Sequence, residues 1–359
     1  MKILLATPLY PPEIGGPATY ARFLENEVPK HGSSIKILKF SDVREYPAGI
    51  RHILFFLKVL KNGPKADVIF AQDAFSVALP SILAAKILGK PFVVRIPGDF
   101  AWEQGRQRFG VEDDIVDFQK NKYGWRVEFY RKIQFWIVRN ADRVLAPSEF
   151  FANLVSGWMK NKKAVALYNG LDIDLIKNYS QQKVNQDLEI ISSGRMVNWK
   201  GFDSLIELVL KNKNWRLSLV GDGPELDNLK NLAIRLDVKD RVNFLGKLDQ
   251  NKLWEKISES DVFVLNSSFE SFSFQVVEAM ALGVPIIATT GCNLEEIITD
   301  GREGFLVPSK SKDLLESAIK KIEDGELRKR MGDLAKIKSE EFSIKKTTEK
   351  LLGIFNEII

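Results

Sequence analysis

The sequence lacks the usual marks of a secreted or membrane-spanning protein. Its 359 residues contain one cysteine, Cys292, which excludes an internal disulfide framework and suits a reducing compartment. No run reaches the roughly 18 apolar residues of a membrane-spanning helix. Residues 1–8 read directly as a strand and lack the long apolar stretch of a signal peptide. We therefore expect a cytoplasmic protein.

Several binding motifs are absent as well. There is no Gly-x-Gly-x-x-Gly dinucleotide fingerprint, even at Gly221-Asp222-Gly223, and none of the usual nucleic-acid-binding motifs. We see no low-complexity tract and no repeat of solenoid or propeller period. The sequence therefore predicts a packed globular protein without a nucleic-acid partner.

Length and patterning predict two α/β domains. At 359 residues the chain exceeds the size at which one hydrophobic core usually stops growing. Strand-like and helix-like segments alternate along it, which predicts parallel sheets. A polar stretch at residues 178–187 reads as a linker between a Rossmann-like domain at 1–177 and a second one from 188 onwards. The candidate strands are residues 2–6, 35–40, 68–71, 91–96, 143–146, 164–167, 188–192, 216–220, 241–245, 261–265 and 285–288.

Positive charge is concentrated in the first half. Residues 1–170 carry 25 Lys and Arg against 16 Asp and Glu, whereas the rest of the chain carries 27 against 31. Two stretches, residues 50–61 and residues 120–143, combine basic with apolar side chains. Basic amphipathic helices of this kind can lie on anionic membrane surfaces. The alternative is an ordinary helix with one face in the core and its lysines in water.

The most informative segment is the loop and helix that follow the strand at residues 261–265. Glu270 lies in the loop and Glu278 about one turn into the helix, which we place at residues 275–282. In an open α/β sheet, ligands bind where strand ends meet helix N-termini, whose amides favour phosphate. A carboxylate one turn further in suits the two hydroxyls of a ribose. The pattern predicts a site for a nucleotide that carries a sugar.

The spacing Glu-x7-Glu, followed by Ala-Met-Ala-Leu-Gly-Val-Pro, resembles the donor-site motif of glycosyltransferase family 4. Four further segments match that family in the expected order, so the resemblance extends over essentially the whole chain. They are residues 193–201 (Ser-Gly-Arg-Met-Val-Asn-Trp-Lys-Gly), 220–225 (Val-Gly-Asp-Gly-Pro-Glu), 243–246 (Asn-Phe-Leu-Gly) and 300–307 (Asp-Gly-Arg-Glu-Gly-Phe-Leu-Val).

The resemblance implies the GT-B fold, with two Rossmann-like domains facing across a cleft. It implies a donor domain at residues 188–335 and a C-terminal helix at 336–359 that packs back on the N-terminal, acceptor-binding domain. It further implies a retaining, metal-independent transfer from a nucleotide-diphosphate sugar to a hydroxyl of a glycan or lipid-linked glycan. The one Asp-x-Asp string, at residues 172–174, falls in a segment that the family uses as a turn, so we expect no metal site.

The family's functional residues are carried over at the matching positions. Arg195 and Lys200 would stabilise the charge of the leaving diphosphate. Glu270 would contact hydroxyls of the transferred sugar and Glu278 those of the ribose. The alternative for both carboxylates is a charge that interacts only with the helix dipole. The other expected contacts to the donor are Gly16, Gly194, Gly223, Phe272, Ser273 and Phe274.

Two departures from the family pattern concern specificity. Pro97 stands about where many family members carry a histidine, and Asp99 is the nearest polar residue. Asp99 would bind a sugar hydroxyl or orient the acceptor, with a helix cap as the alternative. Ser273 stands where glycine is usual, and its hydroxyl would narrow the pocket around the donor sugar.

Two other functions fit the same motifs. A GT-B-like epimerase would convert the donor alone and need no acceptor. A non-catalytic module would bind a sugar nucleotide or a membrane surface without turnover. An acceptor that gains the mass of a sugar separates transfer from both alternatives.

Overall fold

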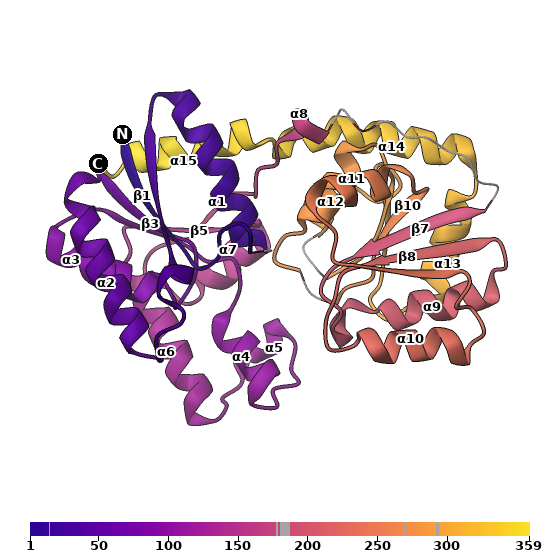
Figure 1. Cartoon of the computed structure of the whole chain (residues 1–359), viewed down its shortest axis with the longest axis horizontal. Helices are drawn as coiled ribbons and strands as arrows, with labels where there is room; N and C mark the ends of the chain where they lie inside the picture. Colours follow the sequence, from indigo (N-terminus) through magenta and orange to yellow (C-terminus); the bar gives the residue numbers. More distant parts are fainter. Residues whose placement is uncertain (14, 177–178, 180–186, 269, 292–293) are drawn as a thin grey trace. The chain divides into compact units, whose positions relative to one another are not determined.

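The computed structural model describes residues 1–13, 15–176, 179, 187–268, 270–291 and 294–359. The chain divides into two compact units (Figure 1). The N-terminal unit comprises Met1–Gly170 and Ile344–Ile359, and the C-terminal unit comprises Leu171–Ser343. In the described residues, each unit contains one six-stranded sheet in which every pair of neighbouring strands is parallel. The expected α/β class with two parallel-sheet domains is confirmed.

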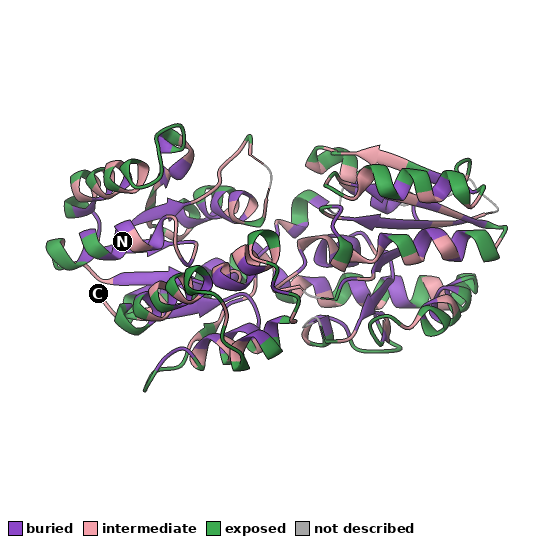
Figure 2. Ribbon diagram, turned by 90° about the horizontal axis from the view of Figure 1, so that it is seen from below, coloured by how far each residue is buried: buried purple, intermediate pink, exposed green. Residues whose placement is uncertain are grey.

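The sheet of the N-terminal unit has the strand order β2-β1-β3-β4-β5-β6. Figure 2 shows that the strands are largely buried and that the outer faces of the helices are exposed. Its strands are β1 (Lys2–Thr7), β2 (Ser34–Lys39), β3 (Val68–Ala71), β4 (Phe92–Arg95), β5 (Arg143–Ala146) and β6 (Val165–Ala166). Its α-helices are α1 (Gly16–Glu27), α2 (Ile50–Asn62), α3 (Ala78–Leu88), α4 (Phe100–Arg108), α5 (Ile115–Lys120), α6 (Trp125–Asn140), α7 (Glu149–Ser156) and α15 (Ile344–Asn356).

The sheet of the C-terminal unit has the order β12-β11-β10-β7-β8-β9, which is the doubly wound order of a Rossmann fold. Its strands are β7 (Leu188–Ser193), β8 (Trp215–Val220), β9 (Val242–Gly246), β10 (Val262–Leu265), β11 (Ile286–Thr289) and β12 (Gly304–Val307). Its α-helices are α8 (Ile173–Ile176), α9 (Phe202–Lys211), α10 (Leu226–Arg235), α11 (Gln250–Ser258), α12 (Phe274–Ala281), α13 (Lys312–Ile322) and α14 (Gly325–Ser339).

Among the strands that the structure describes, β12 is the one that the sequence pattern did not predict. It is an edge strand that pairs only with β11 among the described strands, and its central residues Phe305 and Leu306 are half-buried. Its apolar run, Phe305-Leu306-Val307, has only three residues and is too short to indicate a strand by pattern alone. Gly304 lets β12 approach β11 closely, because a Cβ at this position would overlap the carbonyl oxygen of Ile286 in β11.

The boundary between the units differs from the expected boundaries at 177 and 336. The chain passes between the units at 170–171 and again at 343–344. These two crossings are adjacent, because the Leu171 amide donates to the Phe342 carbonyl at 2.8 Å. Helix α14 therefore belongs wholly to the C-terminal unit and α15 to the N-terminal unit, where Phe355 packs edge-on against Phe70 of β3. Most of the expected linker at 178–187 lies outside the described residues.

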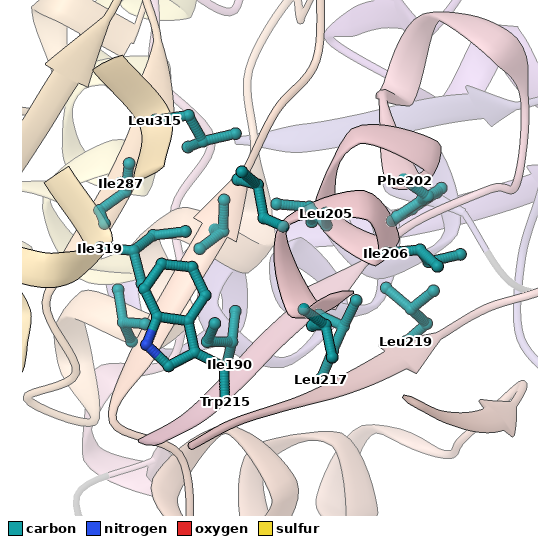
Figure 3. Packing of buried hydrophobic residues seen from close by; sticks show 14 of the residues in the cluster. Ile190, Phe202, Leu205, Ile206, Trp215, Leu217, Leu219, Ile287, Leu315 and Ile319 are labelled. Atoms are coloured by element: carbon teal, nitrogen blue, oxygen red, sulfur yellow. The ribbon is translucent and has the colours of Figure 1, made fainter. Parts of the chain in front are cut away.

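The core of the C-terminal unit holds the strands that lead into the site (Figure 3). Helix α9 buries Phe202, Leu205, Ile206 and Val209, the spacing of one apolar helix face. These side chains belong to one core cluster with Leu315 and Ile319 of α13 and Trp215 of β8. Burial of each such side chain contributes roughly 1.5–3 kcal/mol. Strands β7 and β8 are thereby fixed, and so are the starting points of the loops that follow them.

Candidate active site

The site lies at the topological switch point of the C-terminal sheet, between the neighbouring strands β7 and β10. The chain leads from β7 to β8 toward one edge of the sheet, and from β10 to β11 toward the other edge. The loop after β7 lies against the loop after β10. The Ser268 amide donates to the Trp199 carbonyl at 2.8 Å, and the Asn266 side chain donates to the Gly201 carbonyl at 2.9 Å. Two of the motifs singled out in the sequence therefore meet in space.

Lys200 and Glu270 form an ion pair between these two loops. Their side chains are only 13% and 14% exposed, so water screens the pair less than it would at the surface. The Lys200 ammonium also lies against Gly194, where a Cβ would stand 3.4 Å from Nζ. The structure thus brings together three of the predicted residues. The two charges neutralise each other. Either side chain could instead interact with a ligand that carries a charge or hydroxyl groups.

Glycines allow two backbone segments to touch beside the ion pair. A Cβ at Gly221 would overlap the carbonyl oxygen of Gly194, and a Cβ at Gly223 would overlap that of Met196. The Met196 amide donates to the Asp222 carbonyl at 3.0 Å. Gly194 and Gly223 therefore shape the backbone of the site, as close packing of this kind requires glycine.

Arg195 differs from Lys200 in its surroundings. Its side chain is exposed and makes no ion pair with any residue that the structure describes. A guanidinium on a loop adjoining the switch point remains available to phosphate oxygens, which it can bind through two parallel hydrogen bonds.

Glu278 is buried inside the first turns of α12. One of its oxygens accepts a hydrogen bond from the Gln250 amide at 2.6 Å. The other oxygen and the Trp254 indole N–H are both buried and make no hydrogen bond of ordinary length with the described residues, although Trp254 lies close enough to Glu278 to act on its pKa. Burial raises the pKa of Glu278 to about 7, although Trp254 and Gln250 oppose the shift. A buried acceptor without a donor is costly, so this oxygen suits a ligand hydroxyl.

The N-terminus of α12 places the remaining predicted residues of this loop. Ser273 is the N-cap, and its buried hydroxyl accepts from the Val276 amide at 3.4 Å. This hydroxyl is occupied by the helix, so the structure favours a capping role over the expected narrowing of the pocket. Phe272 and Phe274 pack edge to face, with ring centroids 5.7 Å apart. Both rings are partly exposed.

Gly16 lies in the other unit. It is exposed and is the first residue of α1, directly after Gly15, whose φ of 154° lies in the region that favours glycine. The preceding loop is held by Arg44, which donates to the Pro8 carbonyl at 2.6 Å and pairs with Glu13. Gly16 thus lies after the first strand, as predicted, and its contact with a ligand stays a prediction.

Asp99 lies in the N-terminal unit and is buried. Its carboxylate accepts hydrogen bonds from the Trp102 amide at 3.1 Å and from the side chains of Gln119 and Gln134 at 2.9 and 3.0 Å. Burial raises the pKa of Asp99, and these three bonds oppose the rise. The bond from Trp102 makes Asp99 the N-cap of α4, and the bonds from Gln119 and Gln134 tie the same carboxylate to α5 and α6. The structure therefore favours the helix-cap alternative over a sugar-binding role.

Sequence reasoning missed Gln250 and Trp254. Both come from α11, far along the chain from Glu278, and neither belongs to a motif. In the described part of the chain, no three His, Cys, Asp or Glu side chains gather as metal ligands. No helix in that same part is long and apolar enough to cross a bilayer.

Comparison with known proteins identifies the family. The model for glycosyl transferases group 1 matches residues 176–338, and the model for Glycosyltransferase Family 4 matches residues 11–175. An uncharacterized glycosyltransferase of Haemophilus influenzae is 29% identical over 62% of this chain and 63% of that protein. The lipopolysaccharide core biosynthesis glycosyltransferase LpsE of Rhizobium meliloti is 31% identical over 54% of this chain and 58% of that protein.

Among solved structures, Anabaena HepE in complex with UDP-glucose superposes with a TM-score of 0.78 at 19% identity, over the whole of both chains. At this identity the likeness concerns the fold. The chain spans about three fifths of the length of the two relatives named above. The two family models follow each other along the chain and together span residues 11–338. The resemblance drawn from the motifs is confirmed, and the chain belongs to the group 1 and family 4 glycosyltransferases.

Proposed function

We propose that this protein transfers a sugar, with retention of configuration, from a nucleotide-diphosphate sugar to an acceptor hydroxyl. The observation that carries the proposal is the meeting of Lys200, Glu270 and Gly194 at the switch point of the C-terminal sheet. Ligands of open α/β sheets bind at this position. The family membership supports the same conclusion.

Different residues of the site would bind different parts of the donor. Glu278 would accept hydrogen bonds from the ribose hydroxyls through its unpartnered oxygen. Lys200 and Arg195 would bind the diphosphate and stabilise the negative charge that grows as it leaves. Glu270, which is paired with Lys200, would contact hydroxyls of the transferred sugar. Because two cations and backbone amides surround the leaving group, the reaction requires no metal ion in this proposal.

Retention follows from attack on the face that the leaving group vacates. The transition state resembles an oxocarbenium ion, and an oxygen of the departing phosphate accepts the proton of the acceptor hydroxyl. No protein base is then needed. This agrees with the position of Asp99, whose carboxylate is fully engaged within its own unit.

A lipid-linked glycan is the acceptor class that the surface of the N-terminal unit supports. Helix α2 buries Phe55 and Val59, yet Ile50, Ile53 and Leu57 are 49%, 60% and 52% exposed. The exposed three follow the spacing i, i+3, i+7 and so form a second apolar face, beside basic residues of the same helix. Such a face can lie on an anionic membrane. The relative LpsE acts, by its name, in lipopolysaccharide core biosynthesis.

The test is a turnover screen with a chelator present. Purified protein is incubated with UDP-, GDP-, ADP- or dTDP-sugars and a membrane glycolipid extract, with UDP-glucose tried first. Release of the nucleoside diphosphate together with an acceptor heavier by one sugar supports the proposal. A donor that is isomerised without an acceptor identifies an epimerase. Binding without any turnover identifies a non-catalytic module. Activity that appears only after a divalent metal is added contradicts the metal-independent mechanism.

A further inference from the structure

The segment between β4 and β5 contains a cavity that the donor site does not use. It is an open hollow of about 440 Å³ on the N-terminal unit, formed by the chain before α5 and the chain that begins α6. This volume lies within the roughly 300–1,000 Å³ of pockets that bind small ligands. The side chains that matter in its lining are Phe109, Glu112, Asp113, Tyr123, Trp125 and Arg126.

Aromatic rings make up the apolar part of the lining. Trp125 is 75% exposed, which is unusual for a side chain whose burial contributes so much to stability. The Arg126 guanidinium lies 5.2 Å from the centre of the Trp125 ring and 5.8 Å from that of Phe109. Cation–π contacts at these distances favour this arrangement of the two rings. The cavity thus presents flat apolar faces beside a guanidinium.

Free polar groups stand beside these rings. Glu112 is exposed and makes no hydrogen bond or ion pair with any residue that the structure describes. Asp113 accepts from the Tyr123 hydroxyl and the Asn121 amide through one oxygen only. Its other oxygen has no hydrogen bond from the described residues. Together with Arg126, the lining offers both acceptors and donors at the edge of an aromatic surface.

The wall of the cavity is rigid. Tyr123 stacks on Phe118 with ring centroids 4.8 Å apart. The Arg131 guanidinium lies over the Phe118 ring and donates to the Phe118 and Asn121 carbonyls at 2.8 and 3.0 Å. Asp113 is tied to the same wall through Tyr123. A ligand that enters therefore meets a preformed surface and pays little to order it.

This combination selects among ligand classes. A sugar ring has one apolar C–H face that stacks on an aromatic ring and a rim of hydroxyls that donate to carboxylates and accept from a guanidinium. A phosphate or an anionic lipid head group would be repelled by Glu112 and Asp113. A hydrocarbon chain would leave the same two carboxylates desolvated without a partner.

We propose that this cavity binds one sugar ring of the acceptor, with Trp125 as the stacking platform and Glu112, Asp113 and Arg126 as hydroxyl partners. The inference rests on the proposed transfer to a glycan acceptor, and it specifies which part of the N-terminal unit reads the acceptor. The sugar bound in the cavity can then be a different sugar of the acceptor from the one whose hydroxyl is glycosylated.

Saturation-transfer NMR on the full chain tests this, with methyl glycosides of glucose, galactose, mannose and N-acetylglucosamine as probes. We expect saturation transfer to at least one glycoside. The dissociation constant should rise roughly tenfold in Trp125→Ala and in Asp113→Asn. Trp136→Ala is the matched control, because Trp136 is an exposed tryptophan of the same helix outside the cavity lining. Its glycoside affinity should equal that of the unmodified protein.

The outcomes separate this inference from the proposed function. Melting temperature and nucleotide binding should be unchanged in Trp125→Ala, because the side chain is exposed and lies outside the C-terminal unit. Loss of glycoside binding in that variant supports the sugar site even if no transfer activity is found. No glycoside binding at all, or equal binding in the three variants, overturns the site even if transfer is active. Loss of vesicle binding in Trp125→Ala without any glycoside binding also overturns it, in favour of a membrane contact.

Discussion

Lys200 and Glu270 are 70 positions apart in the sequence, yet their side chains form an ion pair. The pair joins the loop after β7 to the loop after β10, and both groups are mostly shielded from water. In the proposed reaction the Lys200 ammonium binds the phosphate, and the Glu270 carboxylate binds hydroxyls of the sugar. Their mutual contact keeps both in position and keeps the local charge balanced before the donor binds.

Lys200→Ala should lower turnover roughly 100- to 1,000-fold, since it removes one cation that stabilises the leaving diphosphate. The measurement is the rate of nucleoside diphosphate release at saturating donor. Lys256→Ala is the control, because it removes an exposed lysine that is paired with Glu259, and it should leave the rate unchanged. A Lys200→Ala enzyme with full turnover would remove this residue from the mechanism.

Glu278→Gln should change both stability and donor affinity with pH. The pKa of Glu278 is raised from 4.5 to about 7 in the folded protein, so the folded state binds the proton more tightly than the unfolded state. Stability contributed by this group is therefore lost as pH rises from about 4.5 to about 7. At pH 8 the Gln variant should be the more stable protein, by up to about 3 kcal/mol, and at pH 4.5 the two should be equal.

The same variant should bind the nucleotide roughly tenfold or more weakly at pH 8, because hydrogen bonds to a charged acceptor are the stronger ones. Affinity of the unmodified protein should rise between pH 6 and 8, and affinity of the variant should not. Calorimetric titration with UDP at both pH values measures this. A pH-independent affinity in both proteins would argue that Glu278 does not contact the ribose.

Asp99→Ala should reduce the free energy of unfolding by about 2 kcal/mol or more. The change removes the cap of α4, leaves the buried amide of Gln134 without its acceptor, and removes one of the two acceptors of the Gln119 amide. Chemical denaturation measures the loss. Donor affinity should stay the same, since Asp99 lies in the other unit. If instead the variant keeps its stability while the acceptor KM rises, Asp99 binds the acceptor after all.

The double change Ile53→Asp and Leu57→Asp should reduce binding to vesicles of anionic phospholipid at least roughly tenfold, because insertion of each apolar side chain is worth roughly 1.5–3 kcal/mol. Co-sedimentation measures the effect. Stability should change little, because both side chains are more than half exposed. Ile234→Asp serves as the control, since Ile234 is a 60% exposed isoleucine of the C-terminal unit. Equal vesicle binding in all three proteins would exclude α2 as the membrane face.

Much of this protein could be read from local sequence. Short continuous apolar runs indicated eleven of the twelve strands that the structure describes, because a parallel strand that is buried on both faces needs a continuous apolar segment whatever its partners are. Glycine positions such as Gly194 and Gly223 were found through a family motif, and close backbone packing explains them afterwards. The edge strand β12 was not predicted because its apolar run, residues 305–307, is only three residues long.

What the tertiary structure decided are the relationships between distant segments. Strand order places β7 next to β10 and so creates the Lys200–Glu270 pair. The packing of α11 brings Gln250 and Trp254 to Glu278. Asp99 caps α4 through the Trp102 amide, and two glutamines of other helices hold the same carboxylate in place. Sequence alone determined which segments are strands, helices and ligand loops, because periodicity and turn chemistry act over a few residues. Only the fold could decide which side chains meet, because that depends on strand order and packing across the whole unit.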